Sequence, residues 1–205
     1  MTAATQCAAC GSAFSPAQKF CGECGTRLLQ ETLPGADADF GGVAGGERKQ
    51  VTILFCDIVG STPLAAKLGA DRMHRVLNEF MPVAEAHVRQ YDGDLNQFLG
   101  DGFMALFGAP IAREDHARRA ALAALAIRDA VAARVWSTLP AGEQLRIRIG
   151  LNSGPVVFGP VGDKEGASVT AIGDTANVAA RLQTEAQAGQ VVCSAPVAKA
   201  ISAFV

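Results

Sequence analysis

Long apolar runs are missing from this sequence, and no stretch approaches the roughly 20 residues that a membrane-spanning helix needs. The first residues also lack the basic and apolar segments of a secretory signal. An excess of one sign of charge is missing too, because 18 Lys and Arg face 20 Asp and Glu. The resulting net charge of −2 gives no general reason to bind nucleic acid or lipid. We therefore expect a cytoplasmic protein without a membrane or nucleic-acid partner.

Cysteines are nearly absent outside the N-terminal segment. The remainder of the chain has only Cys56 and Cys193, which stand alone, so the pattern is not that of a disulfide framework. The other four form two C-x-x-C-G units, at Cys7, Cys10, Cys21 and Cys24. Such spacing is typical of a four-thiolate site for one structural Zn²⁺. A segment this short cannot bury enough apolar surface to fold alone, so the metal would supply its folding free energy. We predict a zinc ribbon at residues 1–30; two disulfides or unliganded thiols are the alternative.

The remaining chain has the composition of a globular domain, since 49% of the 205 residues are hydrophobic and 19% are charged. Residues 31–47 (ETLPGADADFGGVAGGE) are rich in Gly, Ala and Asp and show no apolar periodicity, which predicts a flexible linker. The chain therefore divides into a ribbon, a linker and a domain at residues 48–205.

The domain opens with a strand over residues 48–57, whose apolar core is continuous enough to predict a central place in a sheet. Asp57 stands at its end, and Gly60, Ser61 and Thr62 then turn the chain into a helix with Thr62 as its expected N-cap. A helix N-terminus offers backbone N–H groups and a positive dipole end. We predict that these three residues bind phosphate.

A second carboxylate follows at the tip of a predicted hairpin. Asp71 is expected to cap a helix that runs to about residue 90, and two short apolar runs at 94–99 and 103–107 then flank Gly100-Asp101-Gly102. Aspartate is also an ordinary turn residue, so Asp101 alone has a plain structural explanation. Together with Asp57 on a neighbouring strand, it predicts a divalent-metal site.

The second half of the chain repeats this alternation of helices and strands. We predict a helix at 113–135 with a solvated His116 in its first turn, and a strand at 145–151 linked by residues 152–155 to a short strand at 156–158. The remaining predicted elements are a strand at 168–172, a helix from 175, a strand at 190–193 and a helix at 195–200. The order predicts an α+β fold of the ferredoxin-like kind, an antiparallel-rich sheet covered by helices.

Asn177 and Arg181 lie four residues apart on the predicted helix from 175, so they project from one face. An arginine one turn after an asparagine is ordinary on a helix surface, and the pair becomes informative only in context. That context is the order of four motifs: FCDIVGST at 55–62, FLGDG at 98–102, IGLNSG at 149–154 and IGDTANVAARL at 172–182. In order and spacing they resemble the class III adenylyl/guanylyl cyclase catalytic domain.

The resemblance spans about residues 48–205, and proteins that join a C-x-x-C ribbon to such a domain are similar to the whole chain. It implies a head-to-tail homodimer that converts ATP to 3′,5′-cyclic AMP and pyrophosphate at the subunit interface. It also implies two Mg²⁺ or Mn²⁺ ions held by Asp57, Asp101 and the backbone carbonyl of Ile58. Asn177 and Arg181 would reach across from the other subunit to the ribose and the transition-state charge. The family's sheet continues past residue 205, so we expect further C-terminal sequence in a full-length protein.

The base-reading positions depart from the family pattern, which commonly has lysine and aspartate where this chain has Gln97 and Thr170. Gln97 can still pair with an adenine edge, and Thr170 can donate or accept, so ATP is favoured while ATP/GTP selectivity is relaxed. A catalytically weak domain that senses nucleotide or mediates dimerisation is the alternative. A polymerase or diguanylate-cyclase-like palm shares the two-aspartate logic, but the sequence lacks a GG[DE][DE]F-like hairpin.

Overall fold

The computed structural model describes residues 5–6, 13–14, 47–161, 168–172 and 174–204. The chain divides into two compact units, residues 1–41 and 42–205. In the first unit, β1 (Thr5–Gln6) and β2 (Ala13–Phe14) pair antiparallel. The four clustered cysteines and nearly all of the expected linker lie outside the described residues. The zinc ribbon therefore stays a prediction.

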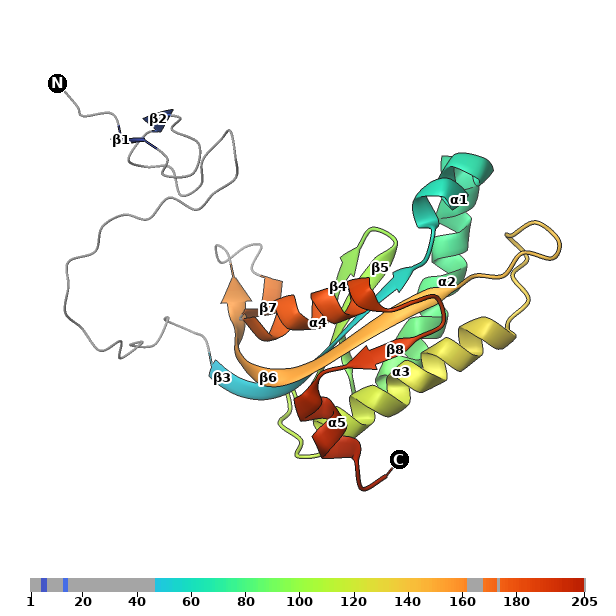
Figure 1. Ribbon diagram of the computed structural model, residues 1–205. Coiled ribbons are helices and arrows are strands. Elements are labelled where there is room, and N and C mark those ends of the chain that lie inside the picture. Colours follow the sequence, from blue (N-terminus) through green and yellow to red (C-terminus); the bar gives the residue numbers. More distant parts are fainter. Residues whose placement is uncertain (1–4, 7–12, 15–46, 162–167, 173, 205) are drawn as a thin grey trace. The chain divides into compact units, whose positions relative to one another are not determined.

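The second unit is built on a six-stranded sheet with the order β4-β5-β3-β6-β7, and β8 pairs with β6 beside this path (Figure 1). Its members are β3 (Glu47–Ile58), β4 (Asp94–Leu99), β5 (Gly102–Phe107), β6 (Ile147–Val161), β7 (Ser168–Ile172) and β8 (Val191–Cys193). All neighbours pair antiparallel except β6 and β8, which are parallel. The predicted antiparallel-rich fold class is confirmed, and β3 lies inside the sheet as its apolar run indicates.

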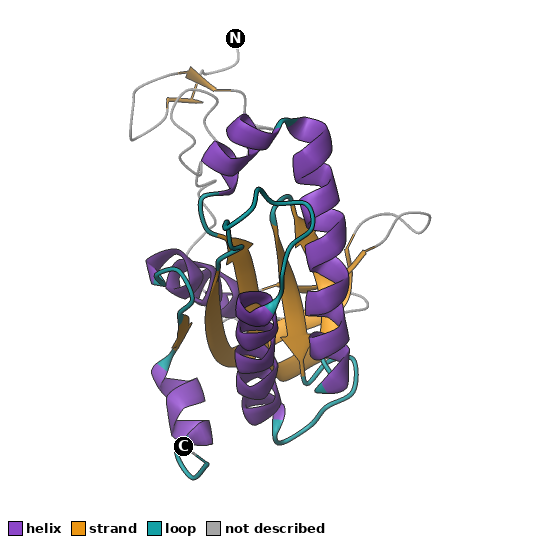
Figure 2. Ribbon diagram, turned by 90° about the vertical axis from the view of Figure 1, so that its right-hand side faces the viewer, coloured by secondary structure: helices purple, strands orange, loops and turns teal. Residues whose placement is uncertain are grey.

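The sheet is covered on both faces. α2 (Ala70–Gln90) and α3 (His116–Ala133) pack on one face, where their apolar side chains meet Leu54, Cys56 and Ile58 of β3. α4 (Asp174–Glu185) packs on the other face against Ile53 and Val51. Figure 2 shows α2 and α3 lying over the sheet. Because side chains alternate along a strand, Asp57 shares the face of Ile53 and therefore points to the α4 side.

Helix starts differ from the predicted ones. α1 (Ser61–Leu68) begins one residue before Thr62, and its N-cap is Gly60 with φ 71°. α2 likewise begins at Ala70 with Gly69 as N-cap, so Asp71 lies within the first turn. Neither start carries a side-chain cap, so glycine backbone conformation and not a capping side chain begins each helix. α5 (Ala195–Ile201) completes the helices.

Strand β6 corrects the prediction of two short strands joined by a link at 152–155. It is one strand of 15 residues, and β3 pairs with it from Ile147 to Phe158. The polar residues that resemble a loop in sequence are satisfied by α4: Asn152 Nδ2 donates to the Thr175 carbonyl at 3.0 Å, and Thr175 Oγ1 donates to the Pro155 carbonyl at 2.8 Å. Helix contact therefore replaces the solvent that a loop would have met.

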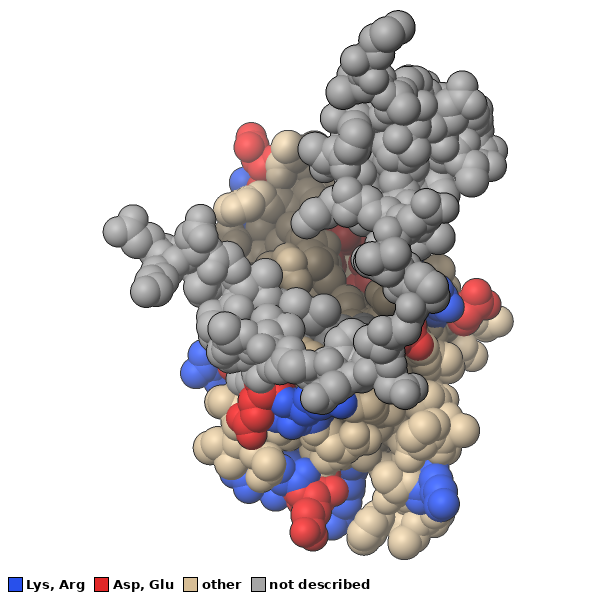
Figure 3. Space-filling model, turned by 90° about the vertical axis from the view of Figure 1, so that its left-hand side faces the viewer, with Lys and Arg blue, Asp and Glu red and all other residues tan. Residues whose placement is uncertain are grey.

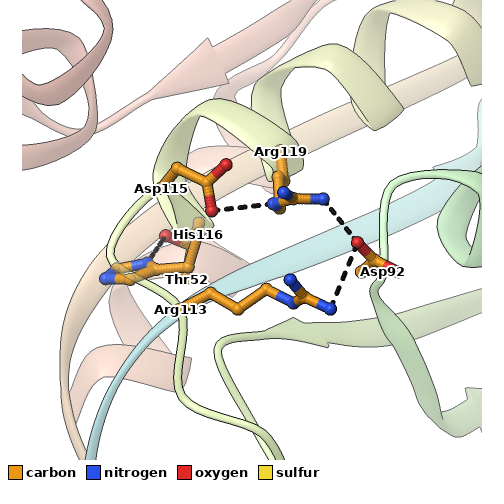
Figure 4. Close-up of polar contacts among 6 residues, drawn as sticks. All are labelled: Thr52, Asp92, Arg113, Asp115, His116 and Arg119. Carbon is orange, nitrogen blue, oxygen red and sulfur yellow. Dashed lines mark hydrogen bonds and ion pairs between the residues drawn. The ribbon is translucent and has the colours of Figure 1, made fainter.

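His116 is not solvated as predicted. It begins α3, is partly buried, and places Nδ1 2.7 Å from Oγ1 of Thr52, which is itself fully buried on β3 (Figure 4). The same hydroxyl lies 2.6 Å from Oγ of Ser153. A polar residue in a helix's first turn faces the sheet here because α3 is pressed against β3.

Surface charges are mixed. On the face seen in Figure 3, blue and red side chains of the described residues lie interspersed and form no extended patch of one sign. No helix in the described part of the chain has both the length and the apolar character required to span a membrane.

Candidate active site

The sheet register brings Asp57 and Asp101 together. Asp57 of β3 lies opposite Gly102 of β5, so Asp101 stands beside it at the hairpin tip. The approach is close, because a Cβ on Gly102 would lie 2.3 Å from the carbonyl oxygen of Cys56. Gly100 has φ 72°, the left-handed conformation that turns the hairpin. Glycines on both sides of Asp101 thus place its carboxylate against that of Asp57.

Asp57 is held by three donors that all reach the same carboxylate oxygen. Arg148 of β6 donates to Oδ2 from Nε at 3.2 Å and from Nη2 at 2.9 Å, and Gln183 of α4 donates to it from Nε2 at 3.2 Å. Burial raises the pKa of Asp57, the hydrogen bonds from Arg148 oppose that rise, and the charge of Asp101 adds to it. The net shift of the Asp57 pKa is upward, so the folded chain disfavours the ionised form of this carboxylate.

A divalent cation fits this pair. Burial and, to a lesser extent, the charge of Asp101 raise the pKa of Asp57, and a cation between the two carboxylates would relieve their repulsion. The side chain of Ile58 is 1% exposed in the core, so only its backbone can serve a ligand. The described residues contain no group of three or more His, Cys, Asp or Glu side chains suited to a metal. Further ligands would therefore be carbonyl, water or phosphate oxygens, the donors that Mg²⁺ favours.

Helix α1 starts shortly after Asp57 in the chain. Gly60 is its N-cap, Ser61 and Thr62 occupy its first turn, and no side chain caps the exposed N–H groups. No acidic residue lies in that turn. The geometry offers backbone donors three residues from Asp57, and phosphate binding by Gly60, Ser61 and Thr62 stays a prediction.

Asn177 and Arg181 point away from Asp57 of their own chain. Along α4, Thr175, Ala179 and Gln183 are buried against the sheet, and residues two positions away lie about 200° around the helix. Asn177 and Arg181 are accordingly exposed. The structure therefore does not bring these two residues to Asp57 within one chain.

The expected base-reading residues lie at the two ends of the strand order. Gln97 is exposed on β4 beside a register shift, and Thr170 lies on β7 opposite Gly159. The side chain of Thr170 is outside the described structure. Their shared role in recognising a base stays a prediction.

Comparison with known proteins gives these residues their context. The family model described as "Adenylate and Guanylate cyclase catalytic domain" matches residues 43–204. The chain belongs to this family. The match covers the second unit apart from its first and last residues, and it includes the four motifs that carry the resemblance.

The curated relatives of this domain include an adenylate cyclase and uncharacterized bacterial proteins. Adenylate cyclase 1 of Rhizobium meliloti (strain 1021) is 36% identical over 148 residues, 70% of this chain and 22% of that protein. An uncharacterized protein of Mycobacterium tuberculosis (strain ATCC 25618 / H37Rv) is 41% identical over 138 residues, 67% of this chain and 23% of that protein. The chain thus spans about a quarter of the length of the curated relatives it matches.

Solved structures match the cyclase domain nearly throughout. The adenylyl cyclase CyaB from P. aeruginosa has a TM-score of 0.73 at 28% identity, covering 78% of this chain and 83% of that chain. The guanylate cyclase domain of RhGC from Catenaria anguillulae in complex with GTP has a TM-score of 0.70 at 31% identity, covering 76% and 84%. The family is therefore shown, whereas the choice between ATP and GTP is not.

Two residues of the cyclase domain's site escaped the sequence predictions. Arg148 follows from the alternation of β6, which places arginines on one face, but its partner Asp57 is 91 positions away. Gln183 gives a weaker signal: it continues the buried series of Thr175 and Ala179 at helical spacing, where a polar residue needs a partner. For both residues the partner is Asp57, and it cannot be predicted from the sequence without knowing how β3 pairs with β6.

Proposed function

We propose that this domain converts a nucleoside triphosphate, preferentially ATP, into its 3′,5′-cyclic monophosphate and pyrophosphate at sites shared by two copies of the chain. The observation that carries the proposal is the pair Asp57 and Asp101, held at adjacent strand ends near a helix start that has no side-chain cap. Membership of the adenylate and guanylate cyclase family supports this reaction type.

Asp57, Asp101 and the carbonyl of Ile58 would hold two Mg²⁺ or Mn²⁺ ions. When bound, such ions supply activation of the ribose 3′-oxygen and neutralise triphosphate charge. The residues of the chain orient the substrate: the N–H groups at the start of α1 donate to phosphate oxygens, and Arg148 adds a guanidinium beside Asp57.

Completion of the site requires a second copy. Asn177 and Arg181 face away from Asp57 on the exposed side of α4, so they are free to serve a neighbouring chain. In that role Asn177 would orient the ribose, and Arg181 would compensate charge that develops at phosphorus. A head-to-tail homodimer provides this geometry twice.

The preference for ATP rests on Gln97 and Thr170. An amide can pair with the adenine edge, and a hydroxyl can either donate or accept. Neither chemistry rejects guanine strongly, so GTP is expected as a slower substrate. The similar proteins point both ways, because one is an adenylate cyclase and another is a guanylate cyclase domain in complex with GTP.

The deciding experiment incubates the purified chain with ATP or GTP and with Mg²⁺ or Mn²⁺, and identifies the cyclic product by chromatography and mass. We expect cyclic AMP to dominate, and Asp57→Asn to abolish it. Nucleotide binding without any cyclic product would reject the enzyme and favour a nucleotide-sensing or dimerisation module.

For the N-terminal unit we propose one structural Zn²⁺ held by Cys7, Cys10, Cys21 and Cys24, on the basis of their doubled C-x-x-C-G spacing. The zinc content of purified protein tests it. About one zinc per chain is expected, and a ratio near zero would refute the site.

A further inference from the structure

Helix α4 is fixed to β6 along its whole length. Near its start, Thr175 exchanges hydrogen bonds with Asn152 and Pro155. In the middle, Gly150 lets the helix backbone approach so closely that a Cβ there would lie 2.4 Å from the Ala179 carbonyl oxygen. At its end, Arg148 Nη1 donates to the Thr184 carbonyl at 3.0 Å. The last turn of α4 is thereby held against the strand that carries Arg148.

Gln183 extends this attachment to the metal pair. Its side chain is buried, with 9% of the residue exposed, and its amide Nε2 donates to Oδ2 of Asp57 at 3.2 Å. A buried amide that spans from a helix to a carboxylate on another element is held in one orientation by packing. The contact joins residues 126 positions apart in sequence.

The hydrogen-bond donors around Asp57 contact only one of its two carboxylate oxygens. Arg148 Nε, Arg148 Nη2 and Gln183 Nε2 all meet Oδ2, and none of them meets Oδ1. Oδ2 thus fixes the orientation of the carboxylate, and Oδ1 receives no hydrogen bond from Arg148 or Gln183. Arg148 alone could swing with its long stem, whereas the amide from a second element removes that freedom.

We propose that Gln183 is a positioning residue for the metal site, which orients the Asp57 carboxylate from α4 for cation binding. The proposal rests on the proposed function, because it takes Asp57 to be a metal ligand. Groups that hydrogen-bond a ligating side chain typically change metal affinity by about 10- to 100-fold when removed. The same helix carries Asn177 and Arg181 on its far face, so one rigid element sets both half-sites of a chain.

The test measures Mn²⁺ binding to the full chain without nucleotide, from the electron paramagnetic resonance signal of free Mn²⁺. Gln183→Met keeps the length of the side chain and removes the donor, and Gln183→Ala removes the donor and the bulk. Both variants are expected to weaken Mn²⁺ binding by about tenfold. At saturating Mn²⁺, kcat of Gln183→Met should return to within about twofold of wild type, because the ligands themselves are intact.

The matched control is Gln187→Met, the same substitution at an exposed position just after α4. It should bind Mn²⁺ as wild type does, and weakened binding in it would reject a specific role for Gln183. Asp57→Asn separates the two proposals. If Asp57→Asn binds Mn²⁺ normally, the metal site of the proposed function is wrong. If Asp57→Asn loses Mn²⁺ while both Gln183 variants retain full affinity, only the positioning role is wrong.

Discussion

At the scale of single residues, the placement of Asp57 beside Asp101 lowers the stability of the folded chain when Asp57 is ionised. Asp57 and Asp101 are placed side by side by the β3–β5 register, and burial and the charge of Asp101 raise the pKa of Asp57. A raised carboxyl pKa means that ionisation is harder in the folded chain than in the unfolded one. The folded state therefore loses stability as the pH rises through that pKa, unless a cation is present.

Asp101→Asn is expected to stabilise the metal-free protein at neutral pH while abolishing activity. Removing the second charge relieves the repulsion on Asp57, and partial solvent screening keeps the gain below about 1 kcal/mol, or about 2–4 °C in Tm. Mn²⁺ should raise the Tm of wild type but not that of the variant. Thermal unfolding with and without Mn²⁺ measures both effects, and an unchanged Mn²⁺ shift in Asp101→Asn would remove this residue from the metal site.

His116 is a second titrating residue, remote from the metal pair on the opposite face of the sheet. Burial lowers its pKa, and the neighbouring carboxylate of Asp115 opposes that shift. Asp115 itself is engaged by Arg119, and Arg119 also reaches Asp92 (Figure 4). The unfolded chain thus binds a proton at His116 more readily than the folded chain does.

Acidification should therefore destabilise the protein through His116. Stability is fully present above the ordinary histidine pKa of about 6.5 and is lost as the pH falls toward the lower folded value. His116→Gln keeps a hydrogen-bonding group near Thr52 and removes the titration. Urea unfolding at about pH 7.5 and about pH 5.5 should show a smaller drop for the variant than for wild type. Equal drops in the two proteins would contradict the assignment, since Asp57 titrates in both.

At the scale of elements, the packing of α4 on β6 determines the position of Gln183 relative to Asp57. Gly150 is the narrowest point: a Cβ there would lie 2.2 Å from the backbone nitrogen of Gln183 and 2.4 Å from the Ala179 carbonyl oxygen. Both neighbours are helix backbone, which cannot rotate aside. Any side chain at position 150 must push α4 away from β6, and with it Gln183 from Asp57.

Gly150→Ala is expected to destabilise the domain by about 1–3 kcal/mol and to lower cyclase activity measured below its Tm. Gly142→Ala is the control, because nothing lies within 4 Å of the added Cβ there and only its φ of 83° is unfavourable. That control should lose stability without a comparable loss of activity. If both variants kept the same activity, close docking of α4 would not matter to the site.

The elements also show which parts of the fold could be predicted from the sequence. The β4–β5 hairpin with Asp101 at its tip was predictable, because short apolar runs around Gly-Asp-Gly are local signals. The continuity of β6 through Asn152 and Pro155 was not, because their polar groups are satisfied by α4, which comes later in the chain. His116 and Gln183 likewise meet partners far away in sequence, Thr52 and Asp57. Long-range packing and strand register, and not local propensity, determine which partners these residues have.

At the scale of the whole molecule, the two groups of proposed site residues in one chain do not face each other. Asp57 points toward the buried face of α4, and Asn177 and Arg181 occupy its exposed face. A two-fold symmetric pair of chains can join each half-site to its complement, so every active site would draw residues from both copies. This arrangement makes the activity of mixed variants informative.

Asp57→Asn and Arg181→Ala are each expected to be inactive as pure proteins, because every site then lacks one half. After mixing and exchange, half of the dimers should be heterodimers with one intact site of two, giving about one quarter of wild-type activity. Differently tagged chains purified in tandem confirm that heterodimers have formed. A control mixture of Asp57→Asn with Asp101→Asn should stay inactive, since both changes fall in the same half-site. If heterodimers of Asp57→Asn and Arg181→Ala form but remain inactive, Arg181 does not act across the interface.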